Sequence, residues 1–98
     1  MHDDGQNELI LDMHAIVEGD VQGVGFRALT LKYARQLGVG GHVRNLSNGN
    51  VEIHAQGNRH KLEKLLDLLK QKLGDGINDI SMTFVPYSDV LKEFHIII

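Results

Sequence analysis

Apolar and polar residues along this chain alternate with two periods, the two-residue period of a strand and the roughly 3.6-residue period of a helix. From Val51 to Ala55 every second residue is apolar, which predicts a strand with one buried face. Two longer segments repeat apolar residues at helical spacing, and Gly38 and Gly74 follow them as helix-terminating residues. The pattern predicts strands over 9–18, 39–46, 51–56, 77–85 and 93–98, and helices over 26–37 and 59–73.

The order of these elements is β-α-β-β-α-β plus a short C-terminal strand. It is typical of an α+β, ferredoxin-like split β-α-β sandwich, in which two helices cover one face of a mainly antiparallel sheet. An Asn-Gly pair at 48–49 predicts a hairpin between the second and third strands, and Asn58 is the expected N-cap of the second helix. We expect residues 9–98 to form a single domain and residues 1–8 to form a flexible tail.

Composition narrows the possible functions and locations. The chain has 98 residues and no cysteine, which excludes disulfides, thiolate metal sites and a cysteine nucleophile. It has no recognisable signal peptide and no apolar run near the roughly 18 residues of a membrane span, so we expect a cytoplasmic protein without a membrane partner. A net charge of -3 argues against broad nucleic-acid binding.

The charges are unevenly distributed along the chain. No acidic residue lies between positions 21 and 51, and this window contains four basic residues, Arg27, Lys32, Arg35 and Arg44. A locally positive region in an acidic protein can attract a small anion without favouring a polyanion.

A glycine-rich stretch opens this window. Gly19, Gly23 and Gly25 lie within seven residues, and Arg27 follows in the first turn of the first predicted helix. A cation there opposes the helix dipole, at a cost of about 0.3–1 kcal/mol. A bound phosphate would offset this conflict, because free backbone N–H groups and the guanidinium would both contact its oxygens. The stretch therefore predicts an anion site.

Two other interpretations of the glycines are weaker. Residues 23–28 fit the G-x-G-x-x-A dinucleotide fingerprint, but no acidic residue for a ribose occurs before Glu52, and the next two strands form a hairpin. A purely structural connection between strand and helix would explain one or two glycines, but it would not explain Arg27.

Polar side chains elsewhere give weaker signals. Asn45, near the end of the second strand, either caps the following turn or orients a water molecule beside the anion. The six histidines are scattered, and none forms a His-x-x-x-His pair, so we expect surface or strand residues and no metal site. Neighbouring strands can still bring two of them together.

Two long motifs in this sequence resemble those of the acylphosphatases, small hydrolases of carboxyl-phosphate bonds. They are GDVQGVGFR at 19–27 and GHVRNLSNGNV from residue 41, closing at Gly57, and the resemblance extends from about residue 13 to the end of the chain. It implies that Arg27 clamps the phosphate, that Asn45 holds the attacking water, and that no cofactor or metal takes part. It also implies phosphate binding by the loop residues Val21, Gln22, Gly23, Val24, Gly25, Phe26 and Arg27.

The sequence departs from the family pattern at two positions. His42 replaces a usually aromatic residue, and Asp20 replaces a basic or neutral residue inside the loop. A carboxylate beside a bound phosphate would weaken it, so we expect Asp20 to point to solvent. These departures bear on affinity and acyl-group preference more than on the chemistry.

The residues also favour an acyl phosphate on chemical grounds. The candidate site offers no strong general base, acid or nucleophile, whereas most phosphate esters need help with a poor leaving group. An acyl phosphate releases a carboxylate, whose conjugate acid has a pKa of about 4, so no proton is needed for departure. We expect a monomer that acts on small-molecule acyl phosphates and releases inorganic phosphate. The alternatives are a non-catalytic phosphate-binding module and, because the topology is shared, an RNA binder, although stacking aromatics are few.

Overall fold

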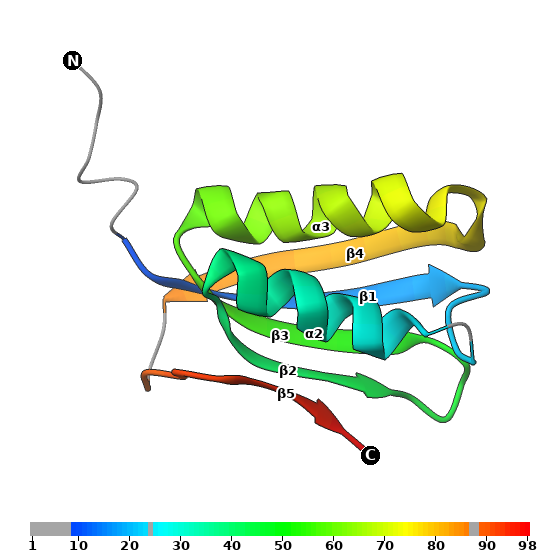
Figure 1. Cartoon of the computed structure of the whole chain (residues 1–98), viewed down its shortest axis with the longest axis horizontal. Coiled ribbons are helices and arrows are strands. Elements are labelled where there is room, and N and C mark those ends of the chain that lie inside the picture. The colour runs from blue at the N-terminus through cyan, green and yellow to red at the C-terminus, as the bar shows by residue number, and fades with distance from the viewer. Residues whose placement is uncertain (1–8, 24, 87–88) are drawn as a thin grey trace.

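The computed structural model describes residues 9–23, 25–86 and 89–98, so the predicted tail lies outside the described residues. Two helices lie on one face of a five-stranded sheet (Figure 1). The elements are β1 (Leu11–Gly19), α2 (Phe26–Leu37), β2 (Gly40–Asn45), β3 (Val51–Gly57), α3 (Arg59–Leu73), the 3₁₀ turn η1 (Gly74–Gly76), β4 (Ile77–Pro86) and β5 (Phe94–Ile97).

The sheet has the strand order β4-β1-β3-β2-β5. The pairs β1–β3, β1–β4 and β2–β3 are antiparallel, and β5 joins the edge parallel to β2. This arrangement confirms the predicted ferredoxin-like α+β fold. No helix among the described residues is long and apolar enough to cross a membrane.

The ends of the helices agree well with the sequence signals. α2 has the predicted bounds, and Gly38 follows it with φ 74° and an N–H directed at the last carbonyls of the helix. α3 begins at Arg59 because the Asn58 side chain accepts a hydrogen bond from the Lys61 N–H at 2.9 Å. β1 begins at Leu11 rather than residue 9, because its two partner strands both end opposite Leu11.

The hydrophobic core lies between the helices and one face of the sheet. Alternate residues of the central strands and one side of each helix are buried there, in the way that the apolar periods predicted. The largest fully buried side chains include Met13, Val17, Phe26, Ile53, Leu62, Leu65, Leu69 and Phe94.

The other face of the sheet is not covered by either helix (Figure 1). The side chains on this face are mostly polar. Strand register places a histidine on each of four neighbouring strands in one line. His14 lies opposite His54, His54 opposite His42, and His42 beside His95. We call these four residues the histidine row. Residues far apart in the sequence thus meet because their strands pair.

Residues 89–91, which precede β5, are held against this open face by Gln56. Its amide donates hydrogen bonds to Asp12 Oδ1 at 2.7 Å and to the Asp89 carbonyl at 2.6 Å, and its oxygen accepts from the Leu91 N–H at 2.7 Å. Gly40 allows the close approach, since a Cβ there would lie 1.8 Å from the Leu91 carbonyl oxygen. The link fixes the point from which β5 returns to the sheet.

Candidate active site

The loop after β1 leads into the positive end of α2. Gly25 is the N-cap residue, with φ 80°, a left-handed conformation that favours glycine, and no side chain caps this helix end. The Gly25 carbonyl accepts the first helical hydrogen bond, from the Leu29 N–H at 2.9 Å. The first N–H groups of α2 have no intrahelical partner, and no acidic residue lies in this turn. The loop and helix end therefore present a local positive potential.

A pocket of about 240 Å³ lies at this helix end. It brings together residues from the loop, the first turn of α2, the end of β2 and the C-terminal segment. Its wall contains both predicted catalytic residues, Arg27 and Asn45. The lining residues are Val21, Gly23, Gly25, Phe26, Arg27, Ala28, Asn45, Ile96 and Ile98. Of the predicted phosphate-binding residues, Gln22 lies outside this lining, and Val24 lies outside the described residues.

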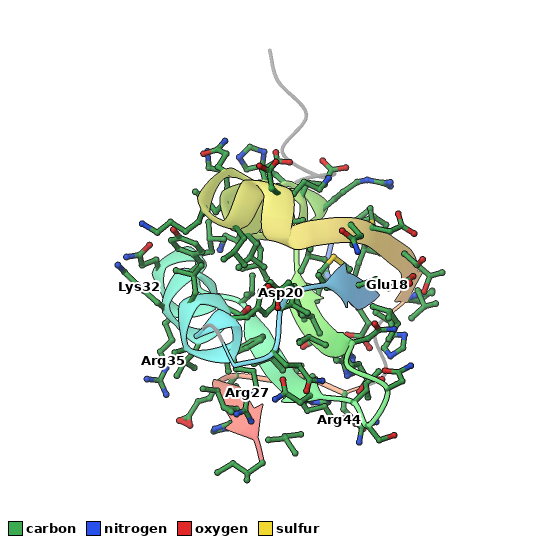
Figure 2. The ribbon with its side chains drawn as sticks, turned by 90° about the vertical axis from the view of Figure 1, so that its right-hand side faces the viewer. Glu18, Asp20, Arg27, Lys32, Arg35 and Arg44 are labelled. Atoms are coloured by element: carbon green, nitrogen blue, oxygen red, sulfur yellow. The ribbon has the colours of Figure 1, made fainter. Side chains whose placement is uncertain are left out.

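Arg27 is the basic residue that the fold directs to this pocket. Lys32 and Arg35 are exposed farther along α2, and Arg44 bonds Glu52 at 2.6 Å on the open face of the sheet. Figure 2 shows Arg27 beside the end of β5, with Lys32 and Arg35 on the outer side of α2. The positive window of the sequence is thus dispersed in space. No carboxylate of the described residues lies within ion-pair distance of Arg27, which leaves its fork available to an anion.

Asn45 ends β2 with its side chain in the same pocket wall. Its Oδ1 atom is buried and, among the described residues, is the one buried side-chain polar atom without a hydrogen-bond partner. Such an unsatisfied acceptor costs about 1–3 kcal/mol. The turn-capping role belongs instead to Asn48, whose Oδ1 accepts from the Asn50 N–H at 3.0 Å. The turn-capping interpretation of Asn45 therefore has no support in the geometry.

Gln22 has a part in the site that the sequence did not indicate. Its Nε2 donates two hydrogen bonds, each of 2.8 Å, to the carbonyls of Leu46 and Asn50. These bonds tie the loop before α2 to the turn after Asn45, and so they fix the spacing between the two halves of the pocket. A two-donor amide has this capacity, but a partner 24 to 28 positions away cannot be read from local sequence.

Ile96 and Ile98 were also missed by the sequence analysis. They form the apolar side of the pocket, opposite the helix end. Ile96 is placed there because β5 pairs with β2 in parallel, which sets it beside Val43, two residues before Asn45. The only sequence signal was the strongly apolar C-terminal segment.

Both departures from the family pattern lie outside the pocket lining. Asp20 is exposed, in agreement with the expectation that it points to solvent, and its backbone N–H donates to the Gly76 carbonyl at 2.8 Å. His42 lies on the open face, edge-on to His54. Burial, and then the neighbouring His54, hold the pKa of the His42 imidazole below its ordinary value of 6.5. Within 9–23, 25–86 and 89–98, no group of three or more His, Cys, Asp or Glu side chains is arranged to hold a metal ion.

Known proteins of one family resemble this chain in both sequence and fold. The family model of the acylphosphatases matches residues 13–96. The acylphosphatase of Deinococcus radiodurans is 42% identical over 84 residues, which cover 84% of this chain and 94% of the relative. That of Bifidobacterium longum is 45% identical over 88 residues, or 90% and 89% of the two chains. The crystal structure of the Bacillus subtilis acylphosphatase superposes with a TM-score of 0.84 at 32% identity, covering 90% of this chain and 99% of that one.

Proposed function

This chain belongs to the acylphosphatase family, and we propose that it hydrolyses the carboxyl-phosphate bond of acyl phosphates in the pocket shared by Arg27 and Asn45. One observation carries the assignment of the residues. The side chain of Arg27, a partly buried residue, and a buried amide oxygen without a described partner line one small pocket at an uncapped helix end. The first suits a phosphoryl group and the second suits a water molecule.

The phosphoryl group binds at the N-terminal end of α2. Arg27 offers two parallel N–H donors to its oxygens, and the first backbone N–H groups of the helix offer more. These donors stabilise the charge that the equatorial oxygens carry in the transition state. The loop residues proposed for this role are Val21, Gln22, Gly23, Val24, Gly25 and Phe26, with Gln22 also holding the loop in position through its side chain.

The attacking water binds to Asn45. Its Oδ1 atom accepts a hydrogen bond from the water and orients the lone pair toward phosphorus, which satisfies the buried acceptor at the same time. A new P–O bond forms to the water oxygen as the P–O bond to the acyl group breaks. The carboxylate leaves unprotonated because the pKa of its conjugate acid is about 4, and the proton of the water passes to solvent. Asn45 has no need to act as a base.

The remaining assignments concern the setting of the reaction. We assign one domain to residues 9–98, acting as a monomer in the cytoplasm on small-molecule acyl phosphates, with inorganic phosphate as a product. The family and the small size of the pocket support the small-molecule substrate.

Hydrolysis of benzoyl phosphate with EDTA present tests this function, beside a phosphomonoester as the substrate control. We expect Asn45→Ala to lower kcat by about 10²–10³-fold, as removal of one positioned polar group does in other sites, with binding of inorganic phosphate retained. Arg27→Ala is expected to lose both binding and turnover. Asn48→Ala and Arg35→Ala are the matched controls, since neither residue lines the pocket.

Several outcomes would contradict the proposal. If Arg27→Ala binds inorganic phosphate with unchanged affinity, Arg27 does not clamp the phosphate. If Asn48→Ala lowers kcat as much as Asn45→Ala does, the loss comes from disturbing the turn and not from the loss of a water-binding group. Folded wild-type protein that binds phosphate without hydrolysing benzoyl phosphate would be a phosphate-binding module instead.

A further inference from the structure

The histidine row lies on the face of the sheet away from the helices and the pocket. It has no part in the reaction proposed above. Within the row, His42 and His54 stand directly opposite each other on β2 and β3. Their ring centroids are 5.2 Å apart and the ring planes are inclined by 89°. Two imidazoles therefore meet on adjacent strands, each on a rigid part of the sheet.

This separation suits a shared metal ion. Two imidazoles on one tetrahedral Zn²⁺, with Zn–N bonds of about 2.0–2.1 Å, have ring centres roughly 5 Å apart. Imidazole nitrogen is also a ligand that Zn²⁺ commonly takes in proteins. Because His42 and His54 lie opposite each other on paired strands, the sheet holds the two rings at this separation.

His54 also has the second partner that metal-binding histidines commonly have. Its Nε2 lies 3.5 Å from Asp12 Oδ2, and the other Asp12 oxygen accepts from Gln56 at 2.7 Å. A carboxylate near one ring nitrogen favours a proton on that nitrogen and leaves the other nitrogen, Nδ1, as the free ligand. His14, the next member of the row, is already engaged, with its Nε2 2.8 Å from Glu52 Oε2.

We propose that His42 and His54 bind one Zn²⁺ ion on the open face of the sheet, with water in the remaining positions. The site joins β2 to β3 and is separate from the pocket of Arg27 and Asn45. It has two protein ligands, which is consistent with the absence of a three-residue metal cluster among the described residues. It is accordingly weaker than a structural zinc site with four ligands.

Titration calorimetry of the chelator-stripped full chain with Zn²⁺ alone, in phosphate-free buffer at pH 7.5, tests the proposal. All proteins carry His2→Gln, which removes a histidine outside the described residues. We expect one ion per chain, and a rise in Tm with Zn²⁺ because the folded state alone holds the two ligands together. His42→Gln and His54→Gln should each weaken binding at least tenfold, and Asp12→Asn by about 10–100-fold.

His60→Gln is the matched control, since His60 is exposed on α3. It should leave the affinity unchanged. The proposal fails if the His2→Gln parent shows neither heat nor a rise in Tm at millimolar Zn²⁺. It also fails if both His42→Gln and His54→Gln bind like the parent protein, or if the His60 control loses binding as they do. Hydrolysis of benzoyl phosphate in EDTA should be the same in His54→Gln and the parent, which keeps this test independent of the proposed function.

Discussion

The link between the two halves of the pocket can be removed with one substitution, Gln22→Met. Methionine keeps the length of the side chain but has no N–H, so both 2.8 Å bonds to the carbonyls of Leu46 and Asn50 are lost. Neither carbonyl is left without a donor. Leu46 still accepts from the Gly49 N–H at 3.2 Å, and Asn50 still accepts from the Leu46 N–H at 2.8 Å.

The expected loss of stability is therefore the net worth of two hydrogen bonds without an added penalty for a buried orphan. At about 0.5–1.5 kcal/mol each, the free energy of unfolding should fall by about 1–3 kcal/mol. For a domain of this size each kcal/mol lowers Tm by roughly 4–8 °C, so a fall of at least roughly 4 °C is expected.

The substitution should also slow catalysis. The substitution frees the loop that holds the phosphate to move relative to the turn that follows Asn45, and a misplacement of about 1 Å can cost about 10²-fold in rate. Thermal unfolding by circular dichroism gives Tm, and benzoyl phosphate hydrolysis well below Tm gives kcat/KM for the folded enzyme. Gln71→Met, at an exposed position of α3, is the matched control. If Gln22→Met equals that control in both Tm and kcat/KM, the link has no role.

Two further predictions concern stability. Gly19→Ala should destabilise the fold by at least about 1–3 kcal/mol in urea unfolding, because φ is 139° and the new Cβ would lie 2.2 Å from the Gly76 carbonyl oxygen. Gly49→Ala, with positive φ but no such contact, should lose less, and equal losses would refute the clash. With EDTA present, the free energy of unfolding should also decrease as the pH is lowered. The folded-state pKa of His42 is below 6.5, mainly through burial and then His54, so the unfolded chain takes up the proton first as the pH drops through 6.5. The hydrogen bond from Arg44 holds the pKa of Glu52 below 4.5, so its contribution is lost as the pH falls below that value. His42→Gln should flatten the slope of Tm between pH 7.5 and 5.5, where His54 and His95 also lie beside His42 on the two neighbouring strands. An unchanged slope would contradict the assignment.

The elements of this fold could be predicted because each depends on local signals. α2 has the bounds that its apolar period and Gly38 indicated, and Asn58 caps α3 as expected. Two parts of the pocket could be predicted. The glycine loop directly precedes the helix that carries Arg27, and Asn45 lies at the end of a predicted strand.

The features that the sequence did not reveal all depend on contacts between distant segments. The histidine row exists only through strand register, and a shift of one residue would turn His54 to the core face. The same applies to Ile96, which reaches the pocket because β5 pairs with β2 in parallel. Hydrophobic periodicity gives the face of a residue along its own strand, but it does not give the neighbouring strand.

The pocket wall joins residues that follow the first strand, among them Val21 and Arg27, to Ile96 and Ile98 far along the chain. A chain emerging from the ribosome therefore cannot form the complete wall until β5 has left the exit tunnel and found the edge of β2. Such a distant closure is slow compared with helix formation, because the loop entropy must be overcome before the contact is made. Hydrolytic activity would then appear only in the last stage of folding, after most secondary structure is in place.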